Sequence, residues 1–507
     1  MPPTSKSKLL RNALYNSGSW LGNIVVTMVA TPYFVFKLSA EGYGVYALLT
    51  GLLGYYGLLD FGLGQGVTKY VAEFSAANDQ GAVNRSINAA LSVQSVVGLI
   101  GSALFILLAE QVLRLLKIPE NLLAVSRVGL YVSACGFFFT MIAGTLNAAL
   151  TGLQLFNITG KVSVVMNIVL TCAIALALAL GGGLLAAIVL TGVSAVFLFG
   201  VYARLLRVHH PGFRFAFDFD RREFGSLGSF SGYMFLSKIS NVFSQYIVRF
   251  VVSAFLGPAA VTLFVVPAKL VSAVGGLLSN GSWVLFPFAS EMQGRNDPGR
   301  ARSIFESGSK YFAAMAVPMF LFIMVAARPL LSLWMGEEFA RQGWEILALL
   351  AFSALLGSLT TVPNLVSMGL GYARVVGLFS VLTIGMYVVL LPILTGSYGP
   401  LGTCWAMVSA TIPGLFLVLY ETKKLLRLSI GRYLRNALAL HLVPIAAALV
   451  FVLSGWSAAI GSSVFGLLGS IGVVGLYVLF LMTCGYLPVE HWLKEIANGD
   501  QLSESAL

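Results

Sequence analysis

Long uninterrupted apolar runs are the feature that most constrains this chain. Stretches such as Val162–Leu180 and Leu184–Val201 contain no charged residue, and each is long enough to cross about 30 Å of hydrocarbon as a helix. Backbone groups cannot hydrogen-bond to lipid, so each run must be helical. Only 10% of the residues are charged, against about 25% in a soluble protein. The sequence predicts an all-α polytopic membrane protein.

We predict fourteen transmembrane helices from the apolar runs. They lie near residues 12–36, 43–66, 86–109, 128–149, 158–180, 184–203, 226–256, 260–287, 309–327, 343–368, 374–396, 400–420, 437–456 and 463–487. The first run is too long for a cleavable signal peptide.

Basic residues are distributed unevenly between the predicted loops. With the N-terminus in the cytoplasm, 22 of the 31 Lys and Arg residues are cytoplasmic, six lie on the other side and three lie within spans. Cytoplasmic loops carry such an excess, which predicts cytoplasmic N- and C-termini in a cell inner membrane. The net charge of +11 is explained in this way, and no nucleic-acid partner is expected. Two interpretations fit the basic loop Arg204–Phe224: orientation alone, or binding of anionic lipid headgroups.

The two halves of the chain resemble each other when they are aligned at one constant offset. Asn78-Asp79-Gln80-Gly81 falls on Asn296-Asp297-Pro298-Gly299, and Glu73 falls on Glu291. Each half contains six spans and therefore has the same orientation, so the repeat is parallel. Parallel repeats place the substrate at the interface between halves, which rock against each other. The predicted parts are an N-lobe (1–203), a basic linker (204–225), a C-lobe (226–421), two further helices (422–487) and a cytoplasmic tail (488–507).

Three cations lie inside predicted spans: Lys238, Arg249 and Lys269. Each costs about 2.5–3.5 kcal/mol near the bilayer centre on insertion scales, so a protein-lined or watery environment is expected. Lys238, Asn241, Gln245 and Arg249 share one helix face by their spacing. The equivalent helix of the first half carries a polar stripe of Asn12, Asn16, Ser19, Asn23 and Thr27.

These residues predict an anion site. Neither Arg249 nor Lys269 has a deep acidic residue in its own half to neutralise it, and a phosphate or diphosphate would do so, with arginine able to bind it bidentately. The expected substrate-binding residues are Arg249, Lys269, Lys238, Asn241, Gln245, Asn23 and Thr27. A second interpretation has Lys238 reaching the cytoplasmic surface and the other cations bonding helix carbonyls. Asp60 fits either ion or proton coupling or a hydrogen bond to a helix end.

No catalytic constellation is recognisable in the sequence. The four histidines have no acid or nucleophile at useful spacing, and the four cysteines lie in apolar runs without metal spacing. The glycines of Gly62-Leu63-Gly64-Gln65-Gly66 follow no strand, so a nucleotide loop is excluded. A transporter without cofactor or metal is expected, and not an enzyme.

Several short segments resemble the Wzx-type polysaccharide flippases of the multidrug/oligosaccharidyl-lipid/polysaccharide exporter superfamily. The resemblance covers nearly the whole chain. Its carriers are Glu41-Gly42-Tyr43-Gly44-Val45-Tyr46, Leu59-Asp60-Phe61-Gly62-Leu63-Gly64, Val71-Ala72-Glu73, Phe255-Leu256-Gly257-Pro258-Ala259-Ala260-Val261, Pro287 with Ser290-Glu291, and Leu333-Trp334-Met335-Gly336.

The resemblance implies a flippase for a polyprenyl-diphosphate-linked oligosaccharide, moved from the cytoplasmic to the periplasmic leaflet. It implies alternating access around a central cationic cavity lined by Arg249 and Lys269, and final helices that accommodate the lipid tail. The expected partners are the lipid-linked oligosaccharide, membrane lipid and glycan polymerase or export machinery. Where relatives carry an acid before the seventh-helix arginine, this chain has Val248.

Two other functions remain open from the sequence. A cation-coupled multidrug exporter of the same superfamily usually has twelve spans and acids in its first-half cavity. A membrane glycan polymerase needs a large extracytoplasmic loop, whereas those near Glu110–Arg127 and Arg328–Gln342 are short.

Overall fold

The computed structural model describes residues 6–54, 59–60, 62–216, 247–283, 285–294, 298–426, 429, 431, 439–454, 464–483 and 486. Every regular element within these residues is a helix. The predicted all-α fold is confirmed.

The chain divides into two compact units. Unit 1 comprises Met1–Lys269 and Gly377–Ala410, and unit 2 comprises Leu270–Val376 and Thr411–Leu507. The helices of unit 1 are α1 (Lys6–Gly54), α3 (Leu63–Ala76), α4 (Gln80–Leu107), α5 (Ala109–Leu115), α6 (Glu120–Gly152), α7 (Phe156–Ala179), α8 (Gly183–His209) and α10 (Val248–Leu256). Those of unit 2 are α12 (Leu285–Gly294), α13 (Pro298–Val325), α14 (Ala327–Met335), α15 (Glu337–Ser358), α16 (Thr361–Gly369), α19 (Ala439–Leu453) and α20 (Val464–Thr483). Helices α11 (Pro258–Ser282) and α17 (Ala373–Leu426) contribute residues to both units.

Ten helical stretches among the described residues are long and apolar enough to cross a membrane. Two of them join predicted spans: α1 continues through a kink at Ser39 from the first predicted span into the first part of the second, and α17 continues through a kink at Gly399 across the two spans near 374–396 and 400–420. The predicted span near 437–456 is the shorter apolar helix α19, and the one near 226–256 lies mostly outside the described residues. The chain is a multi-pass membrane protein, and the total of fourteen spans stays a prediction.

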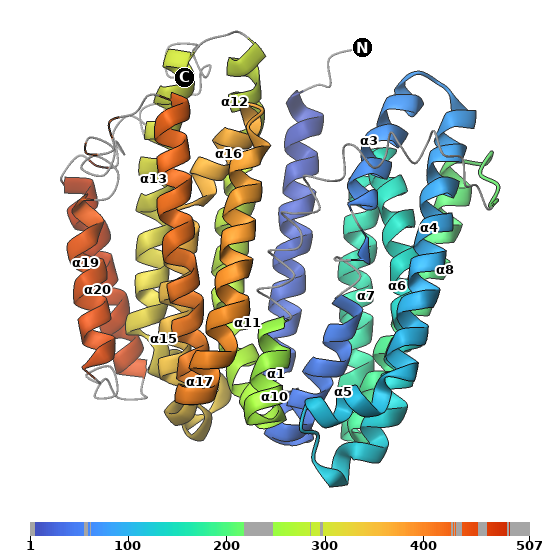
Figure 1. Ribbon diagram of the computed structural model, residues 1–507, viewed down its shortest axis with the longest axis horizontal. Helices are drawn as coiled ribbons and strands as arrows, with labels where there is room; N and C mark the ends of the chain where they lie inside the picture. The colour runs from blue at the N-terminus through green and yellow to red at the C-terminus, as the bar shows by residue number, and fades with distance from the viewer. Residues whose placement is uncertain are drawn as a thin grey trace. The chain divides into compact units, whose positions relative to one another are not determined.

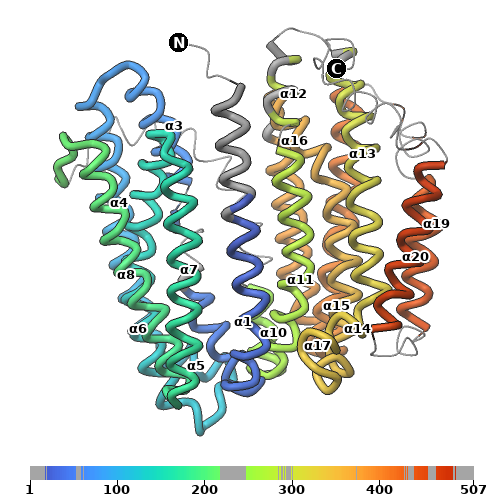
Figure 2. Tube along the Cα trace, turned by 180° about the vertical axis from the view of Figure 1, so that it is seen from behind, coloured from blue at the N-terminus to red at the C-terminus, as the bar shows by residue number. Residues whose placement is uncertain are grey.

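Unit 1 is built around long helices that run side by side, with α4, α6, α7 and α8 packed together (Figure 1 and Figure 2). The start of α1 and the end of α8 lie at the same end of this unit (Figure 1). Its core joins α3, α4, α6 and α8 through buried residues such as Val71, Ile87, Leu150 and Leu206. The opposite faces stay apolar: Phe197 on α8 is 60% exposed, as expected for a side chain that contacts lipid.

The repeat in the sequence is also a repeat in the structure. The alignment that places Asn78 on Asn296 also places the start of α4 on the start of α13, and the start of α5 on the start of α14. The same alignment pairs Ser39 (φ 64, ψ 169) with Gly257 (φ 84, ψ 174), which share an unusual backbone conformation. The two halves therefore place helices and kinks at equivalent positions.

One tight helix contact also recurs, once in each unit. A Cβ on Gly152 would lie 2.8 Å from the Val71 Cβ and 2.9 Å from the Thr68 carbonyl oxygen. A Cβ on Gly369 would lie 2.6 Å from the Ala289 Cβ and 2.8 Å from the Phe286 carbonyl oxygen. Only glycine lets the α6–α3 backbones and the α16–α12 backbones approach this closely.

We expect Gly369→Ala to destabilise the protein by about 1–3 kcal/mol, the usual cost of overpacking a close contact. Thermal unfolding in detergent measures this, and Gly152→Ala should behave in the same way. Gly377→Ala is the matched control, because a Cβ there meets nothing within 4 Å, and alanine alone favours a helix by up to about 1 kcal/mol. A Gly369→Ala variant as stable as the control would contradict the close-packing role.

Candidate functional site

Arg249 and Lys269 lie on consecutive helices of the second half. Arg249 is in the first turn of α10, and Lys269 follows in α11 after the turn at Gly257, whose φ of 84° favours glycine. The charge of Arg249 acts on both Lys269 and Tyr43, so the three side chains share one region of unit 1. Two cations from consecutive predicted spans thus share one region, in which Lys269 contacts α1.

The ammonium of Lys269 is bonded to hydroxyl groups of α1. Its Nζ donates to Thr31 Oγ1 at 2.8 Å and to the Tyr43 hydroxyl at 2.7 Å, and lies 5.4 Å from the centre of the Tyr43 ring. Thr31 and Tyr43 are 1% and 2% exposed. Hydroxyl oxygens satisfy the ammonium protons but carry no opposite charge, so they leave the positive charge available to an anion.

A line of hydrogen bonds continues along α1 from this lysine. Thr31 donates to the Thr27 carbonyl oxygen at 2.6 Å, and Thr27 donates to the Asn23 carbonyl oxygen at 2.8 Å. The steps of four residues place these side chains on one helix face. Asn23 and Thr27 of the predicted polar stripe share this face with Thr31, which is not among the predicted residues and which Lys269 bonds.

Asn23 faces α7 and pairs with polar groups there. Its Nδ2 donates to Ser163 Oγ at 3.1 Å, and its Oδ1 accepts from Asn167 Nδ2 at 2.8 Å. Thr171 donates to Asn167 Oδ1 at 3.4 Å. Asn23 thus links α1 to α7, and both the oxygen and the nitrogen of its side-chain amide are hydrogen-bonded.

Asp60 occupies a separate buried cluster. Its Oδ1 accepts from the Gly64 backbone N–H at 3.0 Å and from Gln94 Nε2 at 3.0 Å. The side chain is 6% exposed and its bond to Gly64 satisfies an N–H group in the first turn of α3, which begins at Leu63. Of the two interpretations of Asp60, the hydrogen bond to a helix end is the one with a described contact.

A further set of contacts joins α10 to the residues that follow α5, and α11 to α1. Ser253 Oγ donates to the Leu116 carbonyl oxygen at 2.6 Å, and Lys117 Nζ donates to the Phe255 carbonyl oxygen at 2.8 Å. Thr262 Oγ1 donates to the Ala40 carbonyl oxygen at 2.6 Å. These bonds hold residues of the two halves together at the end of unit 1 where α10 lies (Figure 1 and Figure 2).

The residues of the site differ from the predicted set. Some residues that contact Lys269 are not predicted, and some predicted residues lie outside the described part of the chain. Lys238, Asn241 and Gln245 lie outside the described residues. Thr31 and Tyr43 are not among the predicted residues, although Tyr43 stands in one of the segments that carry the family resemblance. The signal for Ser163, Asn167 and Thr171 is their spacing of four in an apolar span, which marks a polar helix face.

No group of His, Cys, Asp and Glu that suits a metal ion occurs in the part of the chain that the structure describes. The arrangement instead offers a lysine ammonium, a guanidinium and two hydroxyls, which are the groups that bind phosphate oxygens.

Comparison with known proteins agrees with this picture. The model of the family described as polysaccharide biosynthesis protein matches residues 37–342. A putative O-antigen transporter of Shigella flexneri is 22% identical over 415 residues, which is 78% of this chain and 93% of that protein.

Among solved structures, the lipid II flippase MurJ in an inward closed conformation superposes with a TM-score of 0.73 at 13% identity, covering 94% of this chain and 99% of that chain. An inward-facing multidrug resistance transporter of the MATE family superposes with a TM-score of 0.64 at 14% identity, covering 82% and 99%. The fold is thus shared with membrane flippases and exporters. Because the family match spans more than half of its length, this chain belongs to the polysaccharide biosynthesis protein family.

Proposed function

We propose that this protein flips a polyprenyl-diphosphate-linked oligosaccharide from the cytoplasmic to the periplasmic leaflet of a bacterial inner membrane. The observation that carries the proposal is the Lys269 ammonium, held by neutral hydroxyls of α1 with the charge of Arg249 close by. Cations within apolar helices are costly, and such residues mark substrate or ion pathways. A diphosphate supplies an anion for these cations, and the family and the name of the Shigella flexneri relative support a glycan substrate.

The substrate site combines the cations with the polar face of α1. Arg249 binds phosphate oxygens bidentately, and Lys269 exchanges its hydroxyl partners for a phosphate oxygen. Asn23 and Thr27 extend the polar wall, with Lys238, Asn241 and Gln245 proposed to join it. The sugar lies toward the polar groups, and the prenyl chain stays in lipid.

Transport proceeds by alternating access between an N-lobe (1–203) and a C-lobe (226–421) joined by the basic linker 204–225. Both termini are cytoplasmic, and the helices of 422–487 accommodate the prenyl chain. The bonds of Ser253, Lys117 and Thr262 to backbone carbonyls support this mechanism. Such single hydrogen bonds contribute about 1 kcal/mol each, so they can break and re-form in a cycle. The flipped product is available to a glycan polymerase or export machinery.

Reconstitution tests the proposal directly. Purified protein in liposomes should move a fluorescent polyprenyl-diphosphate oligosaccharide between leaflets, measured by quenching of the outer leaflet. Fluorescent phosphatidylcholine in the same vesicles should stay where it is. Equal movement of both lipids, or of neither, would contradict a substrate-selective flippase.

The multidrug exporter is the second candidate, because the MATE fold likeness favours it. A cationic site repels cationic dyes, so expression should not raise resistance to them in a sensitive strain. Dye resistance that depends on Arg249 and Lys269 would favour the exporter instead.

Replacing Asp60 with Asn, which has the same shape but no charge, distinguishes a role in ion or proton coupling from a purely structural hydrogen bond. If it couples an ion or proton, Asp60→Asn should abolish the dependence of flipping on an ion gradient while leaving stability nearly unchanged. If it only bonds the start of α3 and Gln94, Asp60→Asn should keep gradient dependence, whereas Asp60→Ala should lose about 1–3 kcal/mol of stability. Gradient-driven flipping and thermal unfolding distinguish these results.

A further inference from the structure

The last turns of α8 form a groove on the outside of unit 1. It has a volume of about 550 Å³ and is lined by Phe199, Gly200, Ala203, Arg204, Arg207 and Val208. Gly200 leaves open space, because a Cβ there would meet nothing within 4 Å. The floor, made of Phe199, Gly200, Ala203 and Val208, is apolar, and two guanidinium groups border it.

Neither arginine has a partner among the described residues. Both side chains are exposed, and no ion pair or side-chain hydrogen bond involves them. Residues three apart lie on the same helix face, so the two positive charges repel each other. An anion between them removes this repulsion and gains charge-assisted hydrogen bonds.

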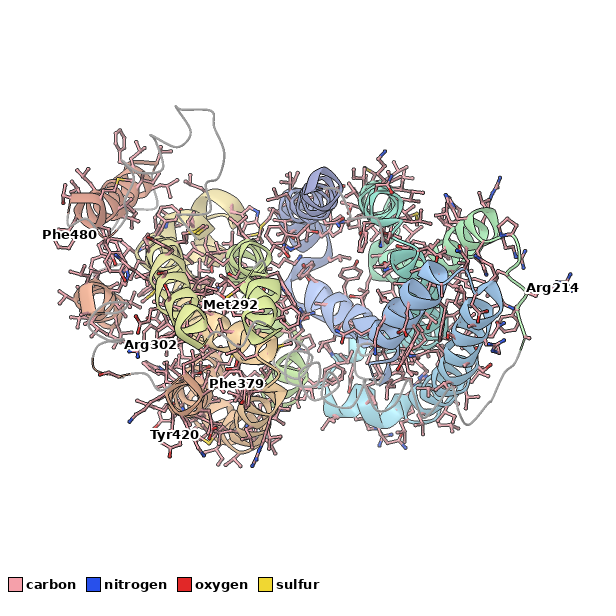
Figure 3. The ribbon with its side chains drawn as sticks, turned by 90° about the horizontal axis from the view of Figure 1, so that it is seen from above. Arg214, Met292, Arg302, Phe379, Tyr420 and Phe480 are labelled. Atoms are coloured by element: carbon pink, nitrogen blue, oxygen red, sulfur yellow. The ribbon has the colours of Figure 1, made fainter. Side chains whose placement is uncertain are left out.

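The groove lies where the apolar surface of α8 gives way to charge. Val193 and Phe197 are 56% and 60% exposed, as expected inside the hydrocarbon, and Arg204 follows two turns later. The described part of the segment after α8, residues 210–216, does not line the groove. It is tied to α4, since the Arg214 backbone N–H donates to Asn84 Oδ1 at 3.2 Å and Asn88 Nδ2 donates to the Arg214 carbonyl oxygen at 2.8 Å. The Arg214 side chain projects outward from unit 1 (Figure 3).

We infer that this groove binds an anionic phospholipid of the surrounding membrane, separately from the transported substrate. The phosphate lies between the guanidiniums of Arg204 and Arg207. One acyl chain follows the small residues Gly200 and Ala203 along Phe199. The combination of unpaired arginines above an apolar floor at the membrane surface matches a charged headgroup joined to an acyl chain, which a free phosphate ion does not.

Native mass spectrometry of the full chain tests the site with phosphatidylglycerol and phosphatidylcholine as probes. Wild type should retain phosphatidylglycerol and not phosphatidylcholine. The double variant R204Q/R207Q should bind phosphatidylglycerol about 30-fold more weakly, because each basic residue near the surface attracts anionic lipid. R204K/R207K keeps the charge and should lose only a few-fold, through loss of the bidentate geometry.

Two further variants test whether phosphatidylglycerol binding depends on the groove itself and on its own arginines. Ala203→Trp should weaken binding while both arginines remain, because the indole fills the groove. K423Q/K424Q removes two exposed cations from α17 and should bind as wild type does. The inference is overturned if R204Q/R207Q binds as tightly as wild type, if K423Q/K424Q loses as much, or if added polyprenyl diphosphate displaces phosphatidylglycerol one for one. In the last case the groove belongs to the transported lipid, while a failure of flipping in liposomes leaves the phospholipid result untouched.

Discussion

Replacing Lys269 with Met should reduce flipping of the lipid-linked glycan on the order of 100-fold, since each charge-assisted hydrogen bond that is lost weakens anion binding by about 1.5–3 kcal/mol. Methionine keeps the length and apolar stem of lysine and removes only the ammonium. Arg249→Gln should have a comparable effect. Surface glycan in a strain that lacks its own flippase, together with membrane abundance of the variant, measures both.

The double variant Tyr43→Phe/Thr31→Val distinguishes the effect of the Lys269 charge from the effect of the two hydrogen bonds that position it. The charge remains, but both described bonds of the ammonium are lost. We expect an intermediate defect of about 5- to 10-fold, because the lysine is misplaced and not absent. The matched control is Lys310→Met, since Lys310 also lies within a long helix and its contacts are with the rings of Tyr311 and Tyr486. Wild-type glycan levels from both Lys269→Met and Arg249→Gln would eliminate the diphosphate site.

Gly44→Ala should disrupt the contact between α1 and the start of α11. A Cβ on Gly44 would lie 1.9 Å from the Pro258 carbonyl oxygen, so the two backbones must separate. Overpacking of this kind costs about 1–3 kcal/mol, equivalent to an equilibrium shift of about 5- to 150-fold. The Thr262–Ala40 hydrogen bond lies in the same contact and should weaken with it.

Cysteine cross-linking measures this opening. In a background without the native cysteines, A40C with T262C should form a disulfide readily, and adding Gly44→Ala should slow it by about the same 5- to 150-fold factor. Gly42→Ala is the control on the same helix, because its Cβ would meet nothing nearer than the Leu38 Cβ at 3.4 Å. Equal cross-linking rates in the two alanine variants would show that close packing at Gly44 does not hold this contact.

Much of the architecture is predictable from local patterns. Apolar runs of membrane-spanning length impose helices wherever they occur, because lipid offers no hydrogen-bond partner. The constant offset between the halves, which two polar loop segments reveal in the sequence, reappears in the starts of α4 and α13 and in the conformations of Ser39 and Gly257. The continuity of α1 is not predictable in this way, since the kink at Ser39 carries neither glycine nor proline, whereas the kink of α17 falls at Gly399-Pro400, where the sequence predicts a break between two spans.

The candidate site is only half predictable. Lys269 and Arg249 stand out because a cation inside an apolar span is costly and therefore rare. Their partners do not stand out, since threonine and tyrosine are common in membrane helices and carry no spacing signal toward a residue in the other half of the chain. Asn23 is predicted to line the substrate site, and the structure gives it partners on α7.

Hydropathy and spacing along single segments are enough to establish the helical membrane fold, the internal repeat and the positive charge within apolar spans. No such local pattern reveals that Lys269 bonds Thr31 and Tyr43, that Gly44 contacts Pro258, or that the groove beside Arg204 and Arg207 is open. These features depend on which helix faces meet, and that choice is made by packing between segments that are distant in the chain.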